Sequence, residues 1–226
     1  MNKRISVFCG SKMGDRPDYH RVATDLGRLL ATNQFGLVYG GASIGLMGAV
    51  ADAALDAGGH VIGVIPKNLK EKEIAHPKLS ELRVVDDMHA RKALMADLAD
   101  GFIALPGGIG TMEELFEVWT WSNLRIHAKP CVLLNVDGYY DDLLRFLDKM
   151  ETAGFIKEQG RSVLRTAESV TEAIEALGSL KKSINFRPRV TYRIGARMGK
   201  PEGSKHREMK PPIHTMFPVG HKVGSK

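Results

Sequence analysis

The residues best suited to chemistry gather near the middle of the chain, in the stretch GFIALPGGIGTMEELFEVWTW, Gly101 to Trp121. An apolar run, a glycine-rich turn and an amphipathic segment predict a buried strand, a tight loop and a helix. Such a turn ahead of a helix presents backbone N–H groups, which bind phosphate. Glu113 and Glu114 follow at once. The sequence therefore places carboxylates beside a predicted anion site.

The position of Glu113 and Glu114 at the mouth of the turn predicts a role for them in that site. A helix N-terminus favours the ionised carboxylate, which suits a stabiliser of a developing cation, or a base that orients water, better than a proton donor. Cleavage of an N-glycosidic bond develops an oxocarbenium-like ribose. A phosphate in the turn would place C1′ of a nucleoside 5′-monophosphate within reach of a glutamate. Glu117 is interpreted only as an acid that the helix dipole favours.

A second polar cluster, DDMHARKALMADLAD, contains Arg91 and Lys92 one turn into another predicted helix. The simplest interpretation is a solvated basic pair. Beside an anion site, however, the guanidinium of Arg91 could clamp phosphate or ribose. Because arginine stays charged, we do not expect Arg91 to protonate the base as a simple acid.

Apolar runs and amphipathic segments alternate along the chain and predict the elements that must position these residues. Strands are expected at residues 4–9, 36–41, 60–66, 81–85, 101–106, 130–135 and, weakly, 162–167, and helices near 19–31, 46–57, 88–98, 112–124, 140–153 and 169–177. Several strands are apolar on both faces, as in sheets covered on both sides. The alternation predicts an α/β fold: a doubly wound, Rossmann-like, mostly parallel sheet of about seven strands with helices on both faces.

Three glycine-containing loops follow the first, second and fifth strands, and they would meet at the carboxyl edge of the sheet, where such folds bind ligands. Ser11 in the first loop and Gly41 in the second are therefore candidate substrate-binding residues. The sequence lacks the Gly-Lys-Ser/Thr of a P-loop and the G-x-G-x-x-G of a dinucleotide fold. It also lacks H-x-x-x-H and C-x-x-C metal spacings.

Composition separates a globular body from a basic tail. From Ser179 onward the chain has 12 Lys and Arg against 2 acids, so the preceding body has 20 basic and 24 acidic residues, a net charge of −4. We expect two parts: a nucleotide-binding domain over residues 1–178 and a Pro/Gly-rich tail over 179–226. No apolar run suits a signal peptide or a membrane span. Cys9 and Cys131 are interpreted as buried, reduced thiols, which predicts a cytoplasmic protein.

Over residues 3–178 the chain resembles the Lonely Guy family of cytokinin-activating phosphoribohydrolases, which carry an old label as possible lysine decarboxylases. The family pattern P-G-G-x-G-T-x-x-E is met by Pro106, Gly107, Gly108, Gly110, Thr111 and Glu114, and M-H-x-R-K by Met88, His89, Arg91 and Lys92. The segments YGG...GLMG, GGHVIGVIP and HAKPCVLLNVDGYYDDLL also fit. The sequence departs from the pattern at Lys12 and in WSNLRIH, where W-x-Q-L-G-I-H is usual, so that Asn123 and Arg125 are expected near the rim of the site.

The resemblance implies hydrolysis of N6-substituted adenosine 5′-monophosphates, or AMP, to free base and ribose 5-phosphate. It implies that Arg91 and Glu114 are catalytic, and that the substrate site is shaped by Glu73, Lys92, the loop Gly107–Glu113 and Thr120. It further implies a homodimer, with Glu73 acting from or across its interface, and no metal or organic cofactor. A non-catalytic nucleotide-binding or sensing module on the same fold is the alternative.

The tail resembles, weakly, a segment of the large subunit of archaeal family D DNA polymerases. The simpler interpretation is a basic extension with little fixed structure. Such a tail could bind polyanions in a salt-dependent way, which leaves a tail-driven nucleic-acid binder as a third hypothesis. We assign the tail no catalytic part and the body no membrane contact.

Overall fold

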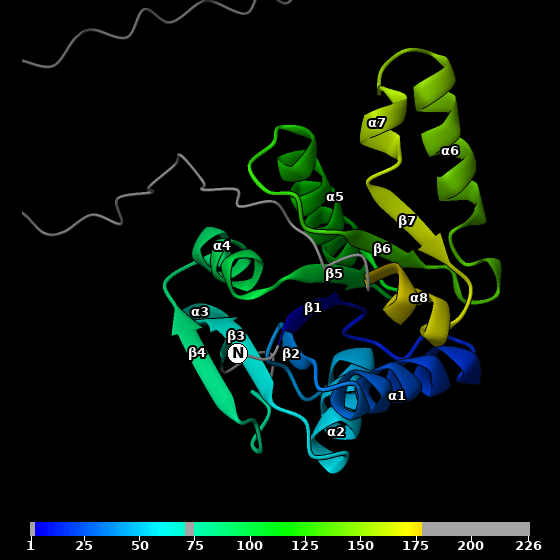
Figure 1. The fold of residues 1–226 in the computed structure, drawn as a ribbon. Coiled ribbons are helices and arrows are strands. Elements are labelled where there is room, and N and C mark those ends of the chain that lie inside the picture. Colours follow the sequence, from blue (N-terminus) through cyan, green and yellow to red (C-terminus); the bar gives the residue numbers. More distant parts are fainter. Residues whose placement is uncertain (1–2, 71–74, 178–226) are drawn as a thin grey trace, which may run out of the picture. The chain divides into compact units, whose positions relative to one another are not determined.

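The computed structural model describes residues 3–70 and 75–177 (Figure 1). All of them belong to the first of two units into which the chain divides, Met1–Val190. Glu73, the tail and the boundary expected after residue 178 lie outside the described residues.

Seven strands form one sheet in which every neighbouring pair is parallel, in the order β4-β3-β2-β1-β5-β6-β7. Their bounds are β1 Arg4–Phe8, β2 Gly36–Tyr39, β3 Val61–Pro66, β4 Glu81–Val85, β5 Gly101–Ala104, β6 Cys131–Leu134 and β7 Leu164–Ala167. The predicted doubly wound α/β fold is confirmed. The strand order changes direction between β1 and β5, so the loops that follow these two strands diverge at the carboxyl edge. This switch point is where ligands bind in such sheets.

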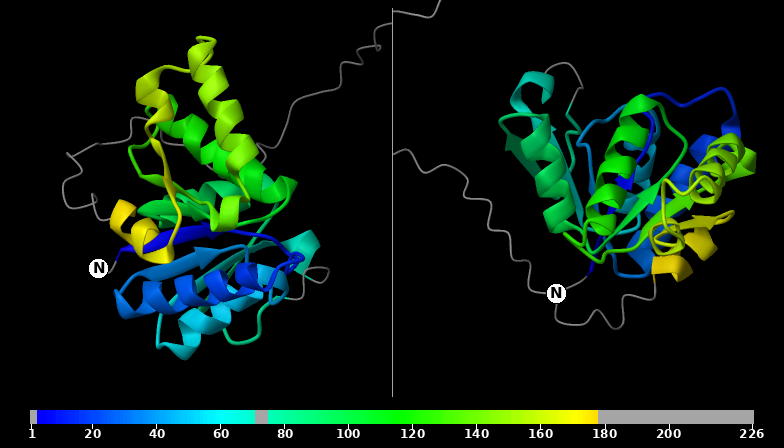
Figure 2. Two further views of the ribbon diagram at one scale, coloured as in Figure 1. Left: turned by 90° about the vertical axis from the view of Figure 1, so that its right-hand side faces the viewer. Right: turned by 90° about the horizontal axis from the view of Figure 1, so that it is seen from above.

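Helices cover both faces of the sheet (Figures 1 and 2). Helices α1 (Pro17–Thr32), α2 (Gly45–Asp56) and α8 (Val170–Leu177) contribute to one apolar core, and α4 (Met88–Leu98), α5 (Ile109–Asn123) and α6 (Asp141–Thr152) to the other. Three short elements were not predicted: α3 (Lys67–Lys70), the 3₁₀ turn η1 (Val136–Gly138) and α7 (Glu158–Arg161). Among the described residues, none of the helices is long and apolar enough to cross a membrane.

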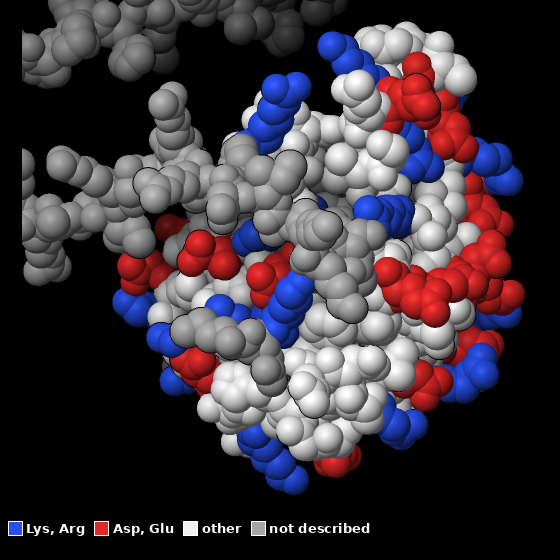
Figure 3. Space-filling model, in the orientation of Figure 1, with Lys and Arg blue, Asp and Glu red and all other residues white. Residues whose placement is uncertain are grey.

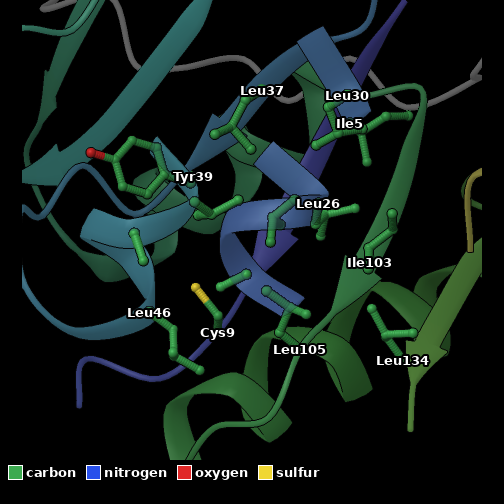
Figure 4. Packing of buried hydrophobic residues seen from close by; sticks show 14 of the residues in the cluster. Ile5, Cys9, Leu26, Leu30, Leu37, Tyr39, Leu46, Ile103, Leu105 and Leu134 are labelled. Carbon is green, nitrogen blue, oxygen red and sulfur yellow. The ribbon is translucent and has the colours of Figure 1, made fainter. Parts of the chain in front are cut away.

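Alternation along the central strands explains why they carry apolar residues on both faces of the sheet. Ile5 and Val7 of β1 enter the core beneath α1 and α2, whereas Phe8 enters the opposite core. Figure 4 shows the first of these cores, where Leu26 of α1 packs among residues of β1, β2 and β5. Full burial of a leucine contributes about 1.5–3 kcal/mol. Two apolar cores therefore cover the two faces of the sheet, and the polar loops lie at its carboxyl edge.

Arg125 lies just beyond the C-terminus of α5 in the left-handed region, with φ of 59°. Its N–H donates to the carbonyl of Ser122 at 2.9 Å, which closes the last turn. Residues other than glycine are strained in this conformation by about 1–2 kcal/mol. The family pattern has glycine at this position, so the departure has a backbone cost.

We predict that Arg125→Gly raises the free energy of unfolding by about 0.5–1 kcal/mol, because relief of left-handed strain exceeds the added entropy of the unfolded chain. Urea denaturation of both proteins measures the difference. Leu124→Gly is the matched control: its φ is −78°, so glycine there should destabilise. If Arg125→Gly is neutral or destabilising, the strain assigned to this residue is absent.

Candidate active site

The loop after β5 leads directly into α5 and forms a cradle of backbone N–H groups. Helix α5 begins at Ile109 with Gly108 as its N-cap, three residues before the predicted start. The N–H of Met112 makes a helical bond to the Gly108 carbonyl at 3.2 Å. The N–H groups from Gly108 to Thr111 thus precede the regular ladder and sit at the positive end of the helix dipole. This arrangement suits an anion.

The glycines of this loop differ in the space around them, and the difference shows which part of the loop faces open space. A Cβ at Gly108 or Gly110 would meet no described atom within 4 Å. At Gly107 it would lie 2.1 Å from the Thr111 hydroxyl oxygen and 2.9 Å from the Gly10 nitrogen. Gly107 is therefore enclosed by its own helix and by the β1 loop, while the next residues face open space.

Backbone contacts join the three glycine loops. The Gly10 N–H donates to the Pro106 carbonyl at 3.1 Å, and the Gly10 carbonyl accepts from Leu46 at 3.0 Å. Ser11 is exposed in the β1 loop, and a Cβ at Gly45 would lie 2.3 Å from its carbonyl carbon. The loops after β1, β2 and β5 therefore share one rim, as the sequence predicted.

Gly41 lies on this rim with φ of +83°, and its carbonyl accepts the N–H of His76 at 2.9 Å. Its neighbour Gly40, which the sequence analysis did not single out, has the more direct contact with the site. A Cβ at Gly40 would lie 2.1 Å from an Nη atom of Arg91. The consecutive glycines after β2 were a visible signal, but the contact depends on how α4 packs.

Arg91 and Glu114 face each other across α4 and α5, with 3.8 Å between Nη2 and Oε1. Their side chains are 7% and 13% exposed. Burial and the charge of Glu114 raise the pKa of the Cys9 thiol, at the end of β1. Glu114 therefore lies near the switch point between β1 and β5, inside the rim formed by the loops.

Lys92, the next residue on α4, pairs with the other two acids of α5. Its ammonium donates to Glu113 and, at 3.1 Å, to Glu117. Burial lowers the pKa of Lys92, but the two glutamates outweigh it and the net shift is upward. The interpretation of Glu117 as a simple helix-dipole acid was thus incomplete, because the carboxylate partners a buried cation of another helix.

Other candidates lie away from the cradle. Thr120 is exposed, and at 1.5 Å per residue it lies about 16 Å along α5 from Ile109. Asn123 and Arg125 were expected near the rim, and that expectation was wrong for a single protomer. They lie at the far end of α5, where a Cβ at Gly160 would meet the Asn123 side chain at 2.5 Å. The sequence could not show this, because a 15-residue helix separates the two ends.

The raised pKa of Lys92 predicts a stability difference that depends on pH. Its ammonium is bound more tightly in the folded state, so the stabilisation is complete below the ordinary lysine pKa of about 10.4 and is lost as the pH rises through the folded-state value. The stability advantage of the wild type over Lys92→Met should therefore be constant from about pH 7 to 10 and shrink above that range. Urea denaturation at each pH measures it.

Lys129 is the matched control because its pKa is shifted in the opposite direction to that of Lys92. Burial lowers its pKa, although Asp97 and Asp100 partly offset this, and its ammonium donates to the Ala96 carbonyl at 2.6 Å. As the pH rises toward the ordinary lysine pKa of about 10.4, the free energy of unfolding of the wild type should increase relative to that of Lys129→Met. Parallel profiles for the two variants would contradict the assignment of Lys92 to its two glutamates.

Comparison with known proteins places these motifs in a family. The family model described as possible lysine decarboxylase matches residues 47–177. The cytokinin riboside 5′-monophosphate phosphoribohydrolase LOG3 of Arabidopsis thaliana is 52% identical over 175 residues, 77% of this chain and 81% of that protein. The cytokinin riboside 5′-monophosphate phosphoribohydrolase of Rhodococcoides fascians is 51% identical over 178 residues, 78% of this chain and 90% of that protein.

Two further comparisons concern the fold and the tail. The molybdenum cofactor binding protein of Rippkaea orientalis has a TM-score of 0.63 at 24% identity, covering 80% of this chain and 99% of that one, and this likeness shows the fold alone. The model for the DNA polymerase II large subunit DP2, central domain, matches residues 136–226, in line with the resemblance of the tail. Given the identity to the phosphoribohydrolases over nearly the whole body, the chain belongs to the Lonely Guy family of cytokinin riboside 5′-monophosphate phosphoribohydrolases.

Proposed function

We propose that the protein hydrolyses the N-glycosidic bond of N6-substituted adenosine 5′-monophosphates, and of AMP, to release the free base and ribose 5-phosphate. The observation that carries this proposal is the shielded pair of Arg91 and Glu114 beside the N–H cradle of α5. Relatives about half identical in sequence bear the name of this activity. We assign no metal and no organic cofactor to the reaction.

The 5′-phosphate binds at the start of α5. The N–H groups from Gly108 to Thr111 supply donors, and the helix dipole adds a favourable field. Glu114 lies five residues after Ile109, or about 7.5 Å along the helix axis. That separation is comparable to the span from a 5′-phosphate to C1′ of the same nucleotide, so a phosphate in the cradle brings C1′ toward the carboxylate.

Glu114 acts where positive charge develops. As the bond from C1′ to the base breaks, its electron pair leaves with the base and the ribose becomes cationic. The carboxylate stabilises that cation and orients water, whose oxygen attaches to C1′ while a proton is lost. The departing base takes up a proton. The result is adenine or an N6-substituted adenine together with ribose 5-phosphate.

Arg91 acts as a permanently charged clamp. Its guanidinium lies against Gly40, where a side chain would displace it, and beside Glu114. In this position it can hold the phosphate or ribose hydroxyls through several donors at once. Lys92 offsets part of the negative charge of Glu113 and Glu117, so that these carboxylates repel the incoming phosphate less.

We predict that Glu114→Gln lowers kcat for AMP and isopentenyl-AMP by about 100-fold or more, because the amide cannot stabilise the cation or accept a proton. KM should change much less, since the cradle is untouched. Release of free base measured by chromatography gives both constants.

Glu117→Gln is the matched control on the same helix, because it loses one of the two carboxylates of Lys92 but leaves Glu114 in place. It should keep most of the activity. If the wild type cleaves neither nucleotide, the enzymatic proposal fails, and if Glu114→Gln cleaves as fast as the wild type, the role assigned to Glu114 fails. Tight nucleotide binding without cleavage would then favour the sensing module.

We also propose that the protein is a homodimer and a cytoplasmic enzyme whose catalytic unit is residues 1–178. Family membership supports the dimer, and large apolar side chains are exposed at Ile109 and Leu124, at the two ends of α5. The two free, buried thiols support a reducing compartment. Lys and Arg are interspersed with Asp and Glu on the face in Figure 3, unlike the clustered basic face of nucleic-acid binders.

Truncation after Gly178 should leave kcat/KM for AMP unchanged and leave a particle of twice the fragment mass, because the site lies wholly in the body. Activity assays and light scattering on both lengths test this. Loss of activity would give the tail a part in the site. Nucleic-acid affinity that is strong in the full chain and absent from the fragment would favour the tail-driven binder.

A further inference from the structure

Two consecutive tyrosines between β6 and α6 hold the loop that forms the cradle. The Tyr139 hydroxyl donates to the Gly107 carbonyl at 2.8 Å, and the Tyr140 hydroxyl donates to the Leu105 carbonyl at 2.6 Å. Both carbonyls belong to the loop after β5, about thirty residues earlier in the chain. The segment GYYDD fitted the family pattern, but no role for these tyrosines was predicted.

The ring of Tyr139 is fixed by its surroundings. Tyr19 of α1 contacts it edge to face with centroids 5.6 Å apart, and Tyr140 does so at 4.7 Å. Tyr140 is in turn held by Asn135, whose side-chain oxygen accepts its N–H at 2.7 Å. The Asn135 amide also donates to Asp141 at 2.8 Å. The hydroxyl of Tyr139 is therefore aimed at the loop by a built network.

Peptide geometry turns this contact into a statement about the cradle. The carbonyl of Gly107 and the N–H of Gly108 belong to one planar trans peptide and point in opposite directions. When Tyr139 holds the carbonyl, it also directs the Gly108 N–H to the other side of the loop. The space around Gly108 is open, and its N–H is the first donor of the cradle.

Tyr140 makes a similar hydrogen bond with a different consequence. The Leu105 carbonyl belongs to the peptide that precedes Pro106, and proline has no N–H. Tyr140 therefore cannot aim a donor in this way. It is 3% exposed, whereas Tyr139 is 43% exposed, so the buried bond serves stability and the outer bond sets a donor direction.

We propose that Tyr139 is a positioning residue for phosphate: it orients the Gly107–Gly108 peptide so that the Gly108 N–H meets the 5′-phosphate of the substrate. This inference rests on the proposed function and adds a residue that sets the affinity of the site for the 5′-phosphate of the substrate. The phosphate binds to the loop, and Tyr139 acts through the loop without touching the reacting atoms.

The test compares Tyr139→Phe with Tyr140→Phe in the full-length protein. Each variant keeps the aromatic ring and removes one hydroxyl. For Tyr139→Phe, KM for AMP should rise about threefold to tenfold, as expected for one misdirected hydrogen bond, with kcat within about twofold. The inhibition constant of ribose 5-phosphate should rise by the same factor, and that of adenine should not change. Tyr140→Phe should lower the melting temperature more and KM less.

The outcomes separate this inference from the proposed function. Wild-type protein that cleaves no nucleotide removes the proposed function, and calorimetric binding of ribose 5-phosphate to the two variants still tests the role of Tyr139. Cleavage by the wild type with an unchanged KM in Tyr139→Phe overturns the inference alone. Equal weakening of ribose 5-phosphate and adenine, or an equal effect in Tyr140→Phe, would indicate a general distortion and also overturn it.

Discussion

The pairing of two consecutive cations on α4 with three carboxylates on α5 is the constraint on which the site depends. Arg91 and Lys92 are both almost fully buried, and a buried charge is tolerated only beside a partner. Because neighbouring residues on a helix point in different directions, Lys92 takes Glu113 and Glu117 while Arg91 turns toward Glu114 and Gly40. The pairing fixes α4 against α5 and leaves one carboxylate directed at the switch point.

The sheet makes this arrangement possible by bringing distant loops to one edge. The loops after β1 and β5 diverge at the switch point, yet Gly10 bonds to Pro106 and Leu46 and so ties all three glycine loops together. Gly107 is enclosed by Thr111 and Gly10, so it admits no side chain without displacement of one of them. The backbone of the loop is thus held in place at Gly107, while Gly108 and Gly110 face open space. A preorganised anion site requires this combination.

Most of the fold could be predicted because its signals are local. The central strands are apolar runs, and the six long helices coincide with the segments predicted between the strands, whereas β7 is mixed in sequence and was predicted only weakly. Four-residue helices such as α3 and α7 give no usable period. The contacts between side chains were harder to predict from the sequence. Glu114 and Arg91 could be recognised from motif and chemistry, whereas the contact of Gly40 with Arg91 and the hydrogen bond from Lys92 to Glu117 depend on helix packing that sequence spacing does not encode.

Charge explains how a carboxylate and a phosphate can share one helix end. Lys92 faces two carboxylates and Arg91 faces one, so the cluster has a formal charge of −1, and Glu114, 3.8 Å from Arg91, is the carboxylate on the side of the ribose. The phosphate is held by N–H groups a turn and a half earlier, where the helix dipole is positive. The length of the sugar thus separates the phosphate from the carboxylate of Glu114, which weakens the repulsion between them. In the ground state Glu114 gains little from a neutral ribose, and its attraction to the sugar becomes strong only when C1′ turns cationic. An interaction that is stronger in the transition state than in the bound substrate is the kind that raises kcat.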